Sequence, residues 1–110
     1  MSLVISEEYF QELAGDCEDR DLNAVWKWLR PDCKNFEEAR EAFFIVLRRL
    51  VVEGHVQLIE MESDHPMGGT VDEQLEQFRK VFPKDDVEMH HALWFFDPNC
   101  PGGCNWKWKR

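Results

Sequence analysis

The chain has 110 residues, of which 44% are hydrophobic and 13% aromatic, and its formal net charge is −9. This length fits one domain over residues 1–110, and the apolar share argues against a disordered chain. No apolar run approaches the roughly 20 residues that span a bilayer, and the first residues lack the basic and apolar regions of a signal peptide. We therefore expect a cytoplasmic protein that does not contact membranes.

The first half of the chain predicts three helices. The first begins after Ser6, a favourable N-cap, and Gly15 is expected to end it. The second covers about residues 21–30, where apolar side chains recur at helical spacing until Pro31. The third begins after Asn35 and is apolar on so many sides that we expect it at the centre of the fold.

The second half of the chain predicts two helices and two strands. Residues 55–61 are expected to form a strand, and residues 71–82 an amphipathic helix behind a capping-box sequence. Residues 85–96 favour a short helix, residues 97–103 turns, and the alternating residues 105–109 a strand. The sequence thus predicts an α+β fold that is mostly helical, with four or five helices and a small antiparallel sheet of two strands or slightly more.

Cysteines and histidines near the C-terminus are the candidates for chemistry. All four cysteines of the chain are expected to be free thiols, since no export signal precedes them. Two of them are separated by three residues and follow two adjacent histidines, a pattern that fits neither a zinc site nor a redox pair well. We expect no metal, no cofactor and no catalysis. The alternative is a small metal-dependent or thiol enzyme that uses His90, His91, Cys100 and Cys104.

The C-terminal residues combine aromatic and basic side chains. Trp106 and Trp108 alternate with Lys107 and Lys109, as on a small surface for stacking nucleic-acid bases. The negative charge of the remaining chain opposes that interpretation, and lysines that protect an exposed strand explain the pattern as well. We therefore expect no nucleic-acid partner. Exposed tryptophans also leave open a structural protein that assembles with itself, so the oligomeric state stays undetermined.

Acidic residues are concentrated in two parts of the chain. Residues 1–24 hold seven acids and one base, and residues 60–76 hold six acids and no base. Such clusters attract basic proteins and raise the association rate when they lie on loops of a rigid scaffold, although a coat that keeps the protein soluble is an equal alternative. The candidate partner-binding residues are Asp16, Glu18, Asp19, Glu60, Glu62 and Asp64.

Four segments resemble a bacterial family of small acidic proteins of unknown function, some of which are similar to immunity proteins of polymorphic or contact-dependent toxins. The segments are FEEAREAF at 36–43, EQFRKVFPK at 76–84, LWFFD at 93–97 and CPGG at 100–103. The resemblance implies a protein that binds a toxin domain, often a nuclease, and blocks its active site or substrate groove. It identifies no site residue, and it leaves the size of the sheet open because the family pattern often continues past the tryptophan strand.

Overall fold

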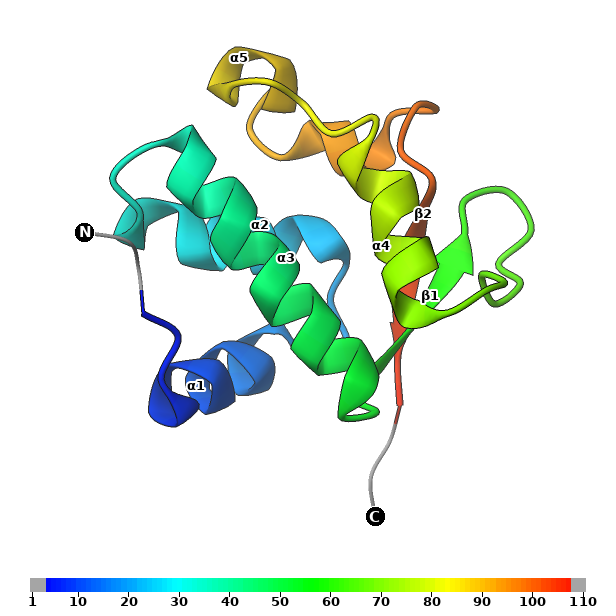
Figure 1. The fold of residues 1–110 in the computed structure, drawn as a ribbon, viewed down its shortest axis with the longest axis horizontal. Helices are drawn as coiled ribbons and strands as arrows, with labels where there is room; N and C mark the ends of the chain where they lie inside the picture. Colours follow the sequence, from blue (N-terminus) through cyan, green and yellow to red (C-terminus); the bar gives the residue numbers. More distant parts are fainter. Residues whose placement is uncertain (1–3, 108–110) are drawn as a thin grey trace.

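The computed structural model describes residues 4–107, which form five α-helices, two short 3-10 helices and two strands (Figure 1). No helix in this range combines the length and apolarity that a membrane span requires. The arrangement confirms the predicted α+β class. In chain order the elements are α1 (Glu7–Cys17), α2 (Leu22–Leu29), η1 (Arg30–Asp32), α3 (Phe36–Val52), β1 (Val56–Glu60), α4 (Val71–Arg79), α5 (Asp86–Met89), η2 (Leu93–Phe96) and β2 (Gly102–Trp106).

Side-chain caps begin the longer helices where the sequence predicts them. Ser6 accepts a hydrogen bond from the backbone N–H of Tyr9 at the start of α1, and Thr70 forms a complete capping box with Glu73 at the start of α4. The predicted end of the first helix at Gly15 is wrong, because α1 continues to Cys17. Nothing lies within 4 Å of the position where a Cβ on Gly15 would stand, so this glycine is an exposed helical residue.

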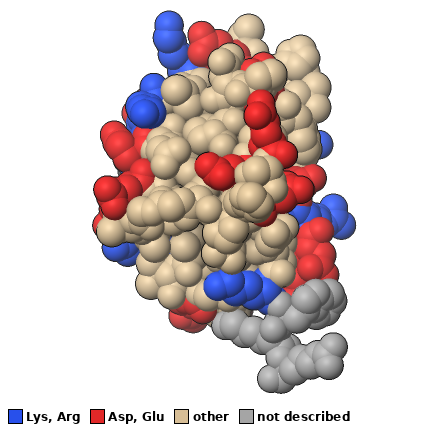
Figure 2. Space-filling model, turned by 90° about the vertical axis from the view of Figure 1, so that its right-hand side faces the viewer, with Lys and Arg blue, Asp and Glu red and all other residues tan. Residues whose placement is uncertain are grey.

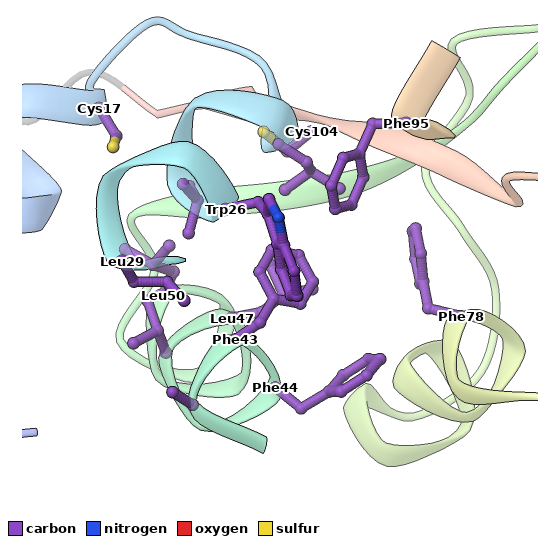
Figure 3. Packing of buried hydrophobic residues seen from close by; sticks show 14 of the residues in the cluster. Cys17, Trp26, Leu29, Phe43, Phe44, Leu47, Leu50, Phe78, Phe95 and Cys104 are labelled. Atoms are coloured by element: carbon purple, nitrogen blue, oxygen red, sulfur yellow. The ribbon is translucent and has the colours of Figure 1, made fainter. Parts of the chain in front are cut away.

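Helix α3 lies at the centre of the fold, as predicted. In Figure 1 it crosses the molecule between the α1–α2 pair and α4. Figure 3 shows Phe43 of α3 packed beside Trp26 of α2, with Phe95 and Cys104 pointing into the same core from the side of the sheet. The ring centroids of Phe43 and Phe95 are 5.3 Å apart. The aromatic core therefore ties α2, α3 and η2 together and holds the sheet in place.

The sheet is antiparallel, with β1 and β2 paired from Val56 opposite Trp106 to Glu60 opposite Gly102. The second strand therefore begins earlier than the predicted 105–109, and residues 108 and 109 lie outside the described range. A Cβ on Gly102 would collide with the backbone carbonyl of Ile59. Gly102 is thus a site of close strand approach, and both glycines belong to β2 and not to the predicted turn.

The predicted helix over residues 85–96 is interrupted. One helical turn, α5, is followed by His90, His91 and Ala92, whose φ angles of 52°, 54° and 69° are left-handed, and then by η2. Val87 is 84% exposed, whereas Trp94 is buried. Val87 and Trp94 therefore do not lie on one buried face of a continuous helix. The left-handed segment redirects the chain so that Trp94 and Phe95 of η2 reach the core.

Candidate protein-binding surface

The first acidic cluster occupies the turn between α1 and α2. Asp16 accepts a hydrogen bond of 2.8 Å from the indole N–H of Trp28, and the Trp28 ring packs edge-on against Tyr9 with centroids 4.9 Å apart. Asp19 is exposed and has a left-handed φ of 65°, a conformation that short polar side chains tolerate. Asp16 therefore also stabilises the α1–α2 pair, whereas the carboxylate of Asp19 faces solvent.

The second cluster occupies the turn that follows β1. Glu60 accepts a hydrogen bond of 3.1 Å from the Ser63 hydroxyl, and the turn is closed by the backbone N–H of Asp64 donating to the Glu60 carbonyl. Asp64 has a φ of 57°. Its carboxylate and that of Glu62 are exposed. Hydrogen bonds within the turn thus fix the backbone from which these acids project.

The two clusters adjoin on the folded protein, which the sequence alone did not reveal. One surface hollow is lined by Asp16, Asp19 and Asp21, among others. A second hollow is lined by Asp21 together with Glu60 and Asp64. Asp21, the residue before α2, is therefore the link between them. We define the acidic surface as Asp16, Glu18, Asp19, Asp21, Glu60, Glu62 and Asp64.

Strand β2 holds the first acidic turn against the sheet. The indole N–H of Trp106 donates to the backbone carbonyl of Arg20 at 2.8 Å, and the thiol of Cys104 lies 3.7 Å from the same oxygen. Both side chains belong to alternate positions of β2. The period-two pattern of the C-terminal residues predicts a strand, but it does not indicate that the strand positions a turn some 85 residues earlier.

The carboxylates of the acidic surface form no close ion pairs with described residues, although Arg20 and Lys27 line the first hollow beside them. Within residues 4–107, none of its seven members forms an ion pair, whereas arginines elsewhere pair with other acids, such as Arg30 with Asp86 and Arg48 with Asp72. Figure 2 looks onto the side that carries the β1–α4 loop and shows acidic side chains on a broad uncharged area, with basic ones toward its margins. A surface with an excess of unpaired carboxylates attracts basic molecules.

The cysteines and histidines of the alternative enzyme hypothesis do not form a cluster. Burial raises the pKa of the Cys100 thiol to about 11 and that of Cys104 to about 12, so both are protonated near neutral pH. His90 and His91 are exposed, with ring centroids 5.9 Å apart. In the described part of the chain, no group of three or more His, Cys, Asp or Glu side chains is placed to hold a metal ion.

Comparisons with known proteins identify the fold and a family. A family model described as "Protein of unknown function, DUF596" matches residues 51–110, more than half of the chain. A solved structure from Neisseria meningitidis, described as "Uncharacterized Protein Conserved in Bacteria", is 24% identical in sequence and superposes with a TM-score of 0.76. That match covers 91% of this chain and 80% of the other. No curated protein matches the chain by sequence.

Proposed function

The chain belongs to the DUF596 family, and from its acidic surface we propose that it is a non-catalytic module that binds a basic protein. The observation that carries the proposal is the continuity of the two acidic turns through Asp21. Separate small clusters steer a partner weakly, because exposed charges are screened within about 10 Å at 0.1 M salt. Several unpaired carboxylates on one surface act together on the same partner.

The scaffold under this surface suits a binding role. Backbone hydrogen bonds from Arg20 to Cys17 and from Asp64 to Glu60 close the two turns. The Trp106 indole fixes the first turn to β2. Turns that are ordered before binding lose less conformational entropy when a partner arrives. The carboxylates of Glu18, Asp19 and Glu62 are exposed, and they accept no hydrogen bond from another described residue. They are therefore free to receive donors from another protein.

The finer form of the proposal is that the partner is a bacterial toxin domain, as the resemblance to immunity proteins implies. A nuclease binds phosphates in a groove lined by lysine and arginine. An acidic protein that occupies this groove replaces the phosphate charge and excludes the substrate. Charge complementarity also gives fast association, which an inhibitor needs if it is to capture a toxin before the toxin acts.

An affinity pull-down from the source organism tests the binding proposal. The tagged protein is used in two forms, the wild type and a surface variant that carries Asp21→Asn, Glu60→Gln and Asp64→Asn. Asparagine keeps an N-cap at position 21 and tolerates the left-handed backbone at position 64, so the variant is expected to fold. We expect the wild type to retain one basic protein in stoichiometric amount at moderate salt.

A control variant with the same change in charge makes the pull-down specific. Glu8→Gln, Glu12→Gln and Glu76→Gln replace exposed acids on α1 and α4 that line none of the acidic hollows. We expect the control variant to retain the partner and the surface variant to lose most of it. Equal retention by both variants contradicts the role of the acidic surface, and protection of cells from the partner's toxicity by co-expression tests the immunity form.

A further inference from the structure

The two outer edges of the sheet differ. The outer edge of β1 is covered by the chain that follows it: the backbone N–H of Glu60 donates to the carbonyl of His65, and the N–H of Met67 donates to the carbonyl of Leu58. An isolated bridge joins Ile59 to Pro66. Strand β2 pairs with β1 alone within residues 4–107. Its outer edge therefore has no neighbouring strand in the described part of the chain.

The register shows which backbone groups of β2 face this edge. The N–H of Lys107 donates to the carbonyl of His55, and the N–H of Met61 donates to the carbonyl of Pro101. Hydrogen-bonded pairs alternate along an antiparallel ladder, so Gly103 and Asn105 also bond to β1. Cys104 and Trp106 point their N–H and C=O groups away from β1, and among the described residues these groups have no backbone partner.

A hollow of about 320 Å³ borders both strands of the sheet and includes Cys104 of this edge. Gly103, Cys104 and Asn105 line it together with the start of α2, the end of β1 and η2. Three members of the acidic surface, Asp21, Glu60 and Asp64, also line it. Phe96 adds an aromatic ring that is 53% exposed. The hollow thus combines unpaired strand groups, carboxylates and an apolar side chain.

We propose that the free edge of β2 binds an extended, lysine- or arginine-bearing segment of the partner as a third strand of the sheet. The inference rests on the proposed function and specifies how the partner binds. Backbone groups of Cys104 and Trp106 pair with the added strand, as in other cases of strand addition. Basic side chains on one face of that strand reach Asp21, Glu60 and Asp64.

Hydrogen exchange of the complete chain tests this proposal with a defined probe. The probe is the peptide acetyl-Lys-Val-Lys-Val-Lys-Val-amide, and the readout is amide exchange and chemical shift measured by NMR on the 15N-labelled protein. We expect the amides of Cys104 and Trp106 to exchange at least about tenfold more slowly at saturation. The amides of Gly103 and Asn105 serve as internal controls, because they already bond to β1.

Two further peptides separate backbone pairing from charge attraction. A peptide methylated on alternate backbone nitrogens keeps its charge but cannot pair fully, and we expect it to bind at least about tenfold more weakly. A Glu-Val peptide of the same length is expected not to bind. Binding of the Lys-Val peptide without protection of Cys104 and Trp106, or no binding at millimolar concentration, overturns strand addition. The proposed function fails on a separate result, namely a partner that binds the surface variant as tightly as it binds the wild type.

Discussion

Trp106 and Arg20 lie 86 positions apart and are joined by a hydrogen bond of 2.8 Å from the indole N–H to the backbone carbonyl. This bond connects the last described strand to the turn that carries Glu18, Asp19 and Asp21. The turn is held between the ends of α1 and α2, and this contact together with the neighbouring Cys104 thiol joins it to β2. The geometry of the acidic surface is therefore coupled to the C-terminal strand.

Replacing Trp106 with Phe should weaken this coupling. Phenylalanine keeps most of the ring but has no N–H, so the fold loses one hydrogen bond, which contributes about 1 kcal/mol to the free energy of unfolding. Urea unfolding measures the loss, and NMR shifts of residues 18–21 show whether the turn moves. An unchanged stability together with unchanged shifts would contradict the structural role of the bond.

Gly102 and Gly103 offer a matched pair for testing the close approach of the strands. Alanine at position 102 places a methyl group against the carbonyl of Ile59, whereas alanine at position 103 meets nothing within 4 Å. We expect Gly102→Ala to destabilise the protein by about 2 kcal/mol or more and Gly103→Ala to change the free energy of unfolding by less than about 0.5 kcal/mol. Similar effects of the two substitutions would show that the strands are farther apart at Gly102.

Burial of the cysteines predicts a loss of stability in alkaline solution. Burial raises the pKa of Cys17 to about 11 and that of Cys104 to about 12 from an ordinary value of 9.0. The unfolded chain therefore releases thiol protons first, and stability that is fully present below pH 9 falls as the pH rises through 11. Urea unfolding at several alkaline pH values should show a shallower decline for Cys104→Ala than for the wild type. Parallel curves would contradict a raised pKa at this thiol.

The left-handed residues after α5 predict an unusual gain from glycine. His91 is exposed with a φ of 54°, a conformation that costs an L-residue about 1 kcal/mol and glycine almost nothing. We expect His91→Gly to leave stability unchanged or to raise it by up to about 1 kcal/mol. His65→Gly is the control, because its φ is not left-handed, and it should lower stability. If His91→Gly lowers stability as much as the control does, the result contradicts a left-handed backbone conformation at His91.

Local chemistry explains why much of the fold could be predicted from the sequence. Ser6 and Thr70 act as caps through contacts within three residues, and the apolar spacing of α3 is a property of one segment. The misplaced turn at residues 101–103 arose because a distant residue decides the outcome. Gly102 lies in a strand that passes close to the carbonyl of Ile59. The residues next to Gly102 in the sequence do not indicate this contact.

The candidate surface could be predicted in part for the same reason. Excess negative charge is visible in the sequence, so both acidic turns were found. Their adjacency depends on the pairing of β1 with β2 and on the contact between Trp106 and Arg20. The role of Asp21 as the link between the two hollows, and the free edge of β2 beside it, likewise follow only from the folded arrangement.

The most direct test of the acidic surface is the salt dependence of the dissociation constant for the partner recovered by pull-down. We predict that the surface variant binds at least about tenfold more weakly than the wild type at 50 mM salt and that its affinity changes less as salt rises to about 300 mM. The control variant should match the wild type at both concentrations. Equal affinity and equal salt dependence of the surface variant and the wild type would contradict the account.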